Sequence, residues 1–188
     1  LLLVSKSLLT REIEDEVERT AGKVKELTLS SKRKEVLDEA LNSLEIAINT
    51  PPGKEGETTH LFETIAKEAL RKAEAAIQYF PSHRRLGIML GRLKDRWKGP
   101  EKAVEWLTRF ITARCREGLD RDGDHAALLY NRACYRNKFA EALEGDGAES
   151  LRNLAWTDLK QSCVLDKLNV EEAVTDPDLK TLFNAQRL

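Results

Sequence analysis

The fold follows from residues 82–118, SHRRLGIMLGRLKDRWKGPEKAVEWLTRFITARCREG. This stretch predicts two antiparallel helices joined by a turn at Lys98-Gly99-Pro100, because glycine is favoured just after a helix and proline in the first turn of the next. Apolar residues recur at helical spacing on both sides of the turn. They are Leu86, Leu90 and Leu93 before it, and Leu107, Phe110 and Ile111 after it.

Small residues lie where the two helices of this hairpin are expected to touch. Gly91 in the first helix and Ala103 in the second are 12 residues apart, one on each side of the turn. Closely packed backbones need small side chains at their contact, so we expect the helices to approach each other there.

Leu90-Gly91 and Ala103-x-x-x-Leu107 together resemble the tetratricopeptide repeat, whose signature has Leu-Gly in one helix and Ala followed by a large residue in its partner. Gly87 and Lys94 stand where that family has aromatic residues. Ala69 precedes Ala103 by 34 residues, which equals the period of the family. The resemblance implies an all-α fold of antiparallel helix-hairpin repeats, stacked as an α-solenoid.

The remaining helices are expected on both sides of this unit. Apolar periodicity predicts them over residues 10–28, 32–49, 60–80, 126–143 and 151–166. Residues 50–59 are expected to form a loop, because they contain two Pro, two Gly and no apolar residue. Asp176 and Pro177 predict the start of a short C-terminal capping helix that carries Leu179, Leu182 and Phe183.

The expected domain organisation has three parts. Residues 1–31 form an N-terminal helix, which is a cap or the tail of an upstream domain. Residues 32–183 form the tetratricopeptide-like domain, and residues 184–188 form a tail. Because the chain of 188 residues begins with Leu1, we expect it to be part of a longer or processed protein.

Composition favours a soluble helical protein, with 34% charged residues and no apolar run long enough to span a membrane. The cysteines are Cys115, Cys134 and Cys163, an odd number without a C-x-x-C pair. That spacing suggests neither a disulfide framework nor a zinc site. We therefore expect buried thiols in a reducing compartment, and a cytoplasmic protein.

No pattern in the sequence predicts an enzyme, a cofactor or a metal. The chain contains no glycine-rich phosphate loop, no H-E-x-x-H and no G-x-S-x-G. Asp120-x-Asp122-Gly123-Asp124 suggests calcium, but the glycine and glutamate positions of an EF-hand loop would hold His125 and Asn131. We therefore expect a protein without catalytic residues.

Charge is concentrated in the middle of the chain although the net charge is only −1. Residues 83–116 contain 10 Lys and Arg but only 3 Asp and Glu, whereas both flanking segments are acidic. In stacked hairpins the first helix of each pair lines the concave groove. The groove residues are then expected to be Arg85, Ile88, Arg92, Asp95 and Arg96 from one unit, and Tyr130, Asn131, Cys134, Asn137 and Lys138 from the next.

Such a groove would attract an acidic peptide or the terminal carboxylate of a protein chain. The first hypothesis is therefore a scaffold or interaction module that binds a protein segment, possibly within a larger protein. The alternative is a nucleic-acid or other polyanion binder that uses the basic patch of residues 83–116, including Lys102, Arg109, Arg114 and Arg116. Neither the global charge nor the scarcity of aromatic residues between the basic ones favours that alternative. The third hypothesis, an enzyme, requires a catalytic domain outside this chain.

Overall fold

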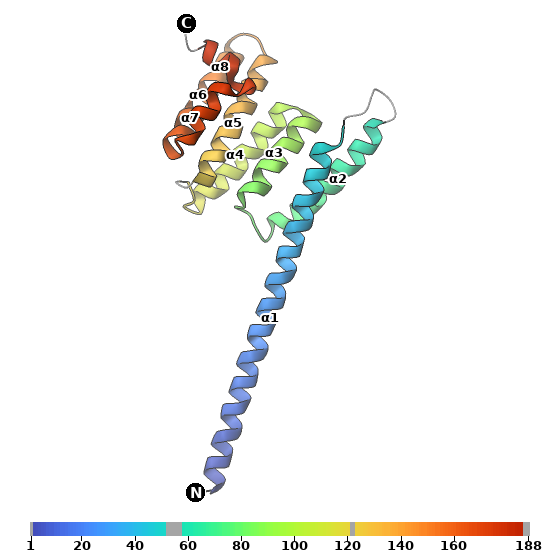
Figure 1. Cartoon of the computed structure of the whole chain (residues 1–188), viewed down its shortest axis with the longest axis vertical. Coiled ribbons are helices and arrows are strands. Elements are labelled where there is room, and N and C mark those ends of the chain that lie inside the picture. Colours follow the sequence, from blue (N-terminus) through green and yellow to red (C-terminus); the bar gives the residue numbers. More distant parts are fainter. Residues whose placement is uncertain (1, 52–57, 121–122, 186–188) are drawn as a thin grey trace.

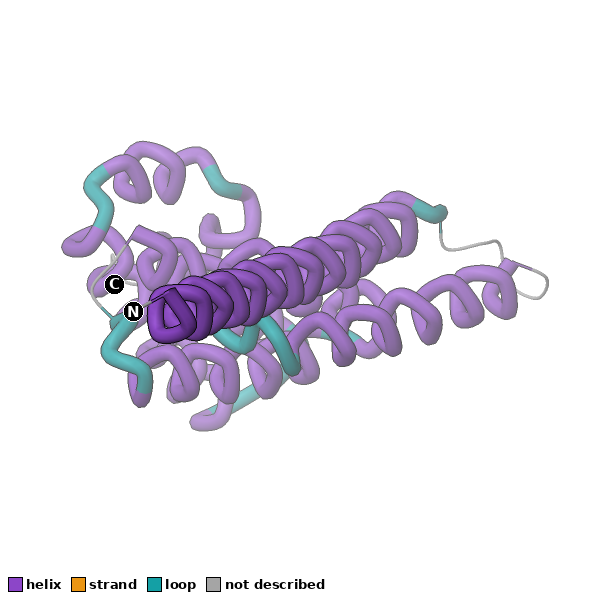
Figure 2. Tube along the Cα trace, turned by 90° about the horizontal axis from the view of Figure 1, so that it is seen from below, coloured by secondary structure: helices purple, strands orange, loops and turns teal. Residues whose placement is uncertain are grey.

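The computed structural model describes residues 2–51, 58–120 and 123–185. Within these ranges the chain folds into helices and contains no strand (Figure 2). The helices are α1 (Leu2–Asn49), α2 (Thr58–Ile77), α3 (Arg84–Lys98), α4 (Pro100–Arg116), α5 (Gly123–Glu141), α6 (Asp146–Leu165), α7 (Leu168–Thr175), the 3₁₀ helix η1 (Pro177–Leu179) and α8 (Lys180–Ala185). Some predicted features lie outside the described residues. They are most of the loop at 50–59, Asp122 of the calcium-like motif, and most of the C-terminal tail. None of the described helices is both long enough and apolar enough to cross a membrane.

Neighbouring helices pack as hairpins, and the hairpins lie side by side (Figure 1). The pairs are α1–α2, α3–α4 and α5–α6, and α3 also packs against both α1 and α5. The C-terminal part of α1 packs against α2 and α3 at one end of this row, and its N-terminal part projects away from the other helices (Figure 1). The all-α class is therefore confirmed.

Helix α1 differs from the prediction, since one continuous helix replaces the two expected at 10–28 and 32–49. The segment between those two contains Ser30 and Ser31 but neither glycine nor proline, so nothing in it forces the helix to stop. Gly22 is also accommodated within the helix, and its surroundings are open. Residues 16–35 are all exposed, and burial begins near Leu37.

The turn between α3 and α4 follows the predicted pattern. Gly99 ends α3 with φ 90°, a backbone conformation that favours glycine, and Pro100 is the first residue of α4. At the other end of α3, His83 is the N-cap, and its Nδ1 accepts a hydrogen bond of 3.3 Å from the Leu86 backbone N–H. Both ends of α3 are therefore determined by local sequence.

Gly87 and Gly91 of α3 both lie against side chains of α4, and the tighter contact is at Gly87. A Cβ atom on Gly87 would lie 2.5 Å from Cε1 of Phe110, whereas one on Gly91 would lie 3.4 Å from Cγ of Leu107. The indole Nε1 of Trp106 donates a 3.1 Å hydrogen bond to the Gly87 carbonyl oxygen. Glycine at position 87 therefore lets an aromatic ring of α4 lie directly on the α3 backbone.

The C-terminal segment covers the end of the α5–α6 hairpin. Asp176 caps η1 by accepting a hydrogen bond from the Asp178 backbone N–H, and Pro177 follows it, as predicted. Leu179 and Leu182 are fully buried in a cluster with residues of α5 and α6. Helix α7, which precedes this segment, was not predicted from the sequence.

Candidate functional site

The candidate site is a cavity of about 440 Å³, called here the α3–α5 cavity. Residues from α1, α3, α5, α7 and η1 surround it, so it forms only when distant parts of the chain come together. Its lining residues are Ile48, Arg92, Asp95, Arg96, Tyr130, Asn131, Cys134, Tyr135, Glu172, Asp176 and Asp178.

The basic side of the cavity comes from α3. Arg92 and Arg96 are exposed and one helical turn apart. Arg96 donates a 2.6 Å hydrogen bond to the Thr50 carbonyl oxygen, and its guanidinium lies 5.7 Å from the centroid of the Phe62 ring. Among the described residues, no hydrogen bond or ion pair engages Arg92. The Arg92 guanidinium is therefore open to an incoming acceptor, while Arg96 is held in place at the cavity edge.

The floor of the cavity comes from α5 and is tied to η1 by Asp176. The Tyr130 hydroxyl donates a 2.8 Å hydrogen bond to Oδ2 of Asp176, and the Cys134 thiol donates to the same oxygen at 3.7 Å. Burial raises the pKa of both Tyr130 and Cys134, and Asp176 shifts both in the same direction. The thiol therefore stays protonated near neutral pH, a form that is a poor nucleophile.

The wall that α7 and η1 contribute to the cavity is acidic. It consists of Glu172 on α7 together with Asp176 and Asp178 at η1. Burial raises the pKa of the Asp178 carboxyl group, while the nearby Lys138 opposes that shift. The cavity therefore has a cationic side and an anionic side, whereas the sequence predicted a groove of mainly basic character.

The structure brings only part of the predicted groove into this cavity. Arg92, Arg96, Tyr130 and Asn131 line it, together with Asp95 and Cys134. Among the others, the Lys138 ammonium forms an ion pair with Asp95, and Arg85 pairs with Glu45 at 3.4 Å. Ile88 packs against the hydrophobic cluster formed by residues of α4 and α5.

Asn137 is fully buried, and its side chain connects α5 to the C-terminal segment by hydrogen bonds. Its Nδ2 donates to the Asp178 carbonyl oxygen at 2.8 Å and to Oγ1 of Thr181 at 2.7 Å. The side chain that was predicted to face a ligand therefore satisfies backbone and hydroxyl groups inside the protein.

Sequence reasoning missed the acidic wall because it missed α7, which carries Glu172, and because it treated Asp176 only as a helix cap. The apolar residues of α7 are largely exposed, with Leu168 at 73% and Val174 at 72%, so this helix lacks the apolar stripe that marks a packed helix. The sequence signal that could have indicated the acidic wall was the Asp176-Pro177 helix start, which was interpreted only as a helix cap.

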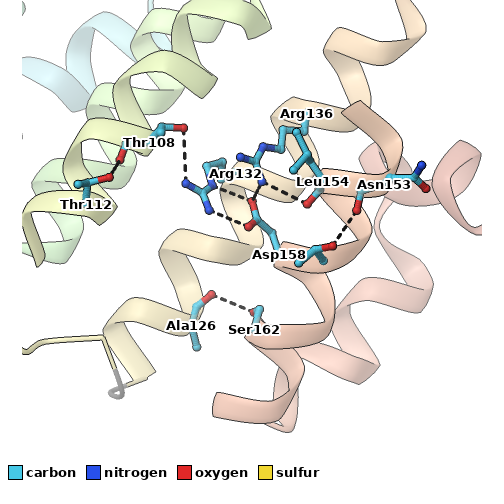
Figure 3. Close-up of polar contacts among 10 residues, drawn as sticks. Thr108, Thr112, Ala126, Arg132, Arg136, Asn153, Leu154, Asp158 and Ser162 are labelled. Atoms are coloured by element: carbon cyan, nitrogen blue, oxygen red, sulfur yellow. Dashed lines mark hydrogen bonds and ion pairs between the residues drawn. The ribbon is translucent and has the colours of Figure 1, made fainter. Parts of the chain in front are cut away.

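A buried ionic cluster on another part of α5 supports the site from outside the cavity (Figure 3). Nε and Nη2 of Arg132 each donate to Asp158 of α6 at 2.7 Å, and Arg136 pairs with the same carboxylate. Arg136 also donates to the Leu154 carbonyl oxygen, and Oγ of Ser162 donates to that of Ala126. These contacts hold α5, which provides the cavity floor, against α6.

The basic residues of the 83–116 segment do not form one continuous surface. Arg114 is 3% exposed and donates to the Ser82 and Leu119 carbonyl oxygens, while Arg84 pairs with Asp124. Arg92 and Arg96 lie on one side of α3, and Lys102 and Arg109 lie beside a different cavity. Among the described residues, no group of three or more His, Cys, Asp or Glu side chains could hold a metal ion.

Comparisons with protein-family models, with curated proteins and with solved structures give no match for this chain.

Proposed function

We propose that this chain is a non-enzymatic interaction module that binds a protein segment in the α3–α5 cavity. The observation that carries the proposal is the meeting of Arg92 and Arg96 of α3 with Tyr130 and Asn131 of α5 around one hollow. The sequence patterns alone had selected these side chains for one groove, although more than 30 residues separate the two groups.

We further propose that the hairpins form a tetratricopeptide-like stack. The positions that carry the resemblance are buried at helix contacts: Leu90, Ala103 and Leu107 are each 0% exposed, and Gly91 is buried beside Leu107. Ala155, in the corresponding slot of α6, is also 0% exposed. Such burial supports a repeat in which small residues mark the contact between paired helices.

The chemistry of the cavity favours a segment that carries both charges. Arg92 and Arg96 are suited to a carboxylate, because guanidinium groups donate parallel hydrogen bonds to its two oxygens. Glu172 and Asp178 on the acidic wall are suited to a Lys or Arg side chain or to backbone N–H groups. A purely acidic segment would place its remaining carboxylates against that wall, where like charges repel.

The test uses short peptides displayed on phage and selected against the wild-type protein. Selected peptides are expected to contain an acidic side chain or a free carboxyl terminus together with a basic residue. Arg92→Glu/Arg96→Glu should weaken binding of a selected peptide at least about tenfold, since both charges that face its carboxylate are reversed.

The matched control is Lys67→Glu/Arg116→Glu, which changes the net charge equally but at exposed positions outside the cavity. This variant should bind the peptide within about twofold of wild type, a difference well below 1 kcal/mol. Both variants should retain the helical circular-dichroism spectrum. Unchanged peptide binding by the folded Arg92→Glu/Arg96→Glu variant would refute the assignment.

A polyanion-binding function is the second candidate. It is favoured by four basic residues around one cavity, Lys94, Lys98, Lys102 and Arg109. A nucleic acid bound there should be released steeply by salt, because each phosphate contact displaces counterions. An electrophoretic mobility-shift assay at low salt measures this directly. If single-stranded and double-stranded oligonucleotides migrate unretarded, this candidate is excluded.

We propose a cytoplasmic location from the cysteines. Cys115, Cys134 and Cys163 are free thiols. Cys134 is buried and Cys163 is partly buried, but Cys115 is exposed, so the expectation of buried thiols is wrong for Cys115. An exposed free thiol persists in a reducing compartment. Fractionation of cells that express the natural protein tests this, and recovery in a secreted fraction would contradict it.

A further inference from the structure

A second cavity, called here the tryptophan cavity, lies between α2, α3 and α4 and has a volume of about 470 Å³. Its lining residues are Leu70, Lys94, Trp97, Lys98, Lys102, Glu105, Trp106 and Arg109. Lys94 and Lys98 lie two residues beyond Arg92 and Arg96, and two residues turn an α-helix by about 200°. Helix α3 therefore presents opposite faces to the two cavities.

The apolar part of the tryptophan cavity has fixed walls. Trp106 is held by the hydrogen bond from its Nε1 to the Gly87 carbonyl oxygen and by its contact with Phe110, with ring centroids 5.8 Å apart. Trp97 and Leu70 are partly buried against the cluster that joins α1, α2 and α3. These side chains provide a preformed surface for an apolar group.

The charged part of the cavity carries more cationic than anionic groups, with four Lys or Arg side chains and Glu105. Lys102 is engaged by Glu105 at 2.7 Å, which leaves Lys94, Lys98 and Arg109 without an ion pair among the described residues. Burial lowers the pKa of the Lys94 ammonium group and Arg109 acts in the same direction, while Glu74 and Glu105 oppose that shift. Lys94, Lys98 and Arg109 line one cavity without ion-pair partners in the described part of the chain, and this arrangement favours a negatively charged ligand.

The lysines also restrict what can lie against the indole rings. Nζ of Lys94 is 5.6 Å from the centroid of the Trp106 ring, and Nζ of Lys98 is 4.3 Å from that of Trp97. A nucleobase that stacks on either ring would have to displace a cation from a favourable cation–π contact. A flexible aliphatic chain does not need to stack on a ring face, so it can pack beside the rings and leave the ammonium groups available to its head group.

We propose that the tryptophan cavity binds a small amphiphile with an aliphatic body and a carboxylate head group. The volume lies within the range of about 300–1,000 Å³ that is usual for small-molecule sites, and apolar walls with a few convergent polar groups are typical of them. The aliphatic body lies against Leu70, Trp97 and Trp106. The carboxylate accepts hydrogen bonds from Lys94 and Arg109. This site is independent of the peptide bound in the α3–α5 cavity.

Octanoate is the probe, and binding is followed by isothermal titration calorimetry and by intrinsic tryptophan fluorescence. Two of the three Trp residues line the cavity, so saturable binding should change the emission. Octylammonium has the same chain with the opposite charge, and acetate has the same head group without the chain. Both should fail to bind at concentrations that saturate with octanoate.

Lys94→Gln/Arg109→Gln should weaken octanoate binding at least about tenfold, because charge-assisted hydrogen bonds to the carboxylate are lost. Lys67→Gln/Arg116→Gln removes two charges outside the cavity and should bind octanoate like wild type. The proposal is overturned if octanoate shows no saturable binding, if octylammonium binds equally well, or if the folded Lys94→Gln/Arg109→Gln variant binds octanoate unchanged.

Discussion

Gly87 and Gly91 lie one turn apart on α3 and face α4 at different distances. A Cβ atom at position 87 would overlap the Phe110 ring at 2.5 Å, whereas one at position 91 would make ordinary contacts of 3.4–3.5 Å with Leu107 and Tyr135. Both substitutions to alanine would gain about 1 kcal/mol of helix propensity. Only the alanine at position 87 would have to displace the packed ring of Phe110.

We therefore predict that Gly87→Ala lowers the free energy of unfolding by about 1–3 kcal/mol, as overpacking does elsewhere. Gly91→Ala, which is its matched control, should be neutral or slightly stabilising. Urea unfolding followed by circular dichroism measures both values. A larger loss for Gly91→Ala than for Gly87→Ala would place the helix contact where the sequence pattern alone had placed it.

His83 links the stability of α3 to pH. Its Nδ1 can accept the hydrogen bond from Leu86 only while that nitrogen is unprotonated. Burial lowers the pKa of His83 below its usual 6.5, and Arg84 and Arg85 act in the same direction, while Asp124 opposes them. The native state therefore binds the proton less readily than the unfolded state does.

From this sign, the stabilisation by the His83 cap should be fully present above pH 6.5 and should disappear as the pH falls through the lower pKa of the native state. His83→Ser keeps an N-cap without a titrating group. Melting temperatures measured from about pH 8 to about pH 5 should fall less for His83→Ser than for wild type. Parallel curves for the two proteins would rule out this cap as a source of the pH dependence.

Asp158 is the shared partner of two buried guanidinium groups. Replacing it with alanine would leave Arg132 and Arg136, whose side chains are 12% and 11% exposed, without their carboxylate. Loss of one member of a buried ion pair is expected to cost about 3–5 kcal/mol. Thermal unfolding of Asp158→Ala should show this loss, while Asn153→Ala on the exposed side of α6 should stay near wild type. A melting temperature of Asp158→Ala equal to that of the control would contradict it.

At the scale of elements, α1 combines two kinds of helix. Residues 16–35 are exposed throughout, while Leu37, Ala40 and Leu44 enter the core with α2 and α3. An isolated helix has little stability in water, so the projecting part depends on continuation from the packed part.

Hydrogen exchange should separate the two parts. Backbone amides of residues 16–34 are predicted to exchange much faster than those of residues 38–48, because local opening there exposes no buried apolar surface. Exchange followed by mass spectrometry of peptides from each part measures the difference. Equal protection at low protein concentration would contradict the single projecting helix.

The hairpin turn and the C-terminal cap were predictable because local rules decide them. Gly99 with Pro100, and Asp176 with Pro177, act within a few residues of themselves. The continuous α1 was missed because serine is only a weak helix breaker. Helix α7 was missed because its position depends on contacts with α6 and not on an apolar stripe.

Only the α3 and α5 sides of the candidate site could be predicted from the sequence. Helical periodicity brought Arg92 and Arg96 together on one face, and the resemblance set Tyr130 and Asn131 opposite them. Asn137 bonds to Thr181 and Lys138 bonds to Asp95, and each partner is about 43 residues away in sequence. Such long-range pairings have no local signature, so the acidic wall and the inward-facing Asn137 appear only in the folded chain.

At the scale of the whole molecule, α3 separates two cavities of different character. The α3–α5 cavity has charged walls of both signs, and the tryptophan cavity combines indole rings with lysines. Because the two cavities lie on opposite faces of one helix, ligands of the two sites should bind without competing. Octanoate at saturation should therefore leave the affinity for a selected peptide within about twofold of its value in the free protein.

The most direct test of the proposed function is a nuclear magnetic resonance titration of the ¹⁵N-labelled protein with a peptide selected on phage. Binding in the α3–α5 cavity should shift the side-chain amide signal of Asn131 and the Nε–H signal of Arg92. The indole N–H signals of Trp97 and Trp106 should stay in place. Shifts of the indole signals, with those of Asn131 and Arg92 unmoved, would contradict the assignment of the peptide to this cavity.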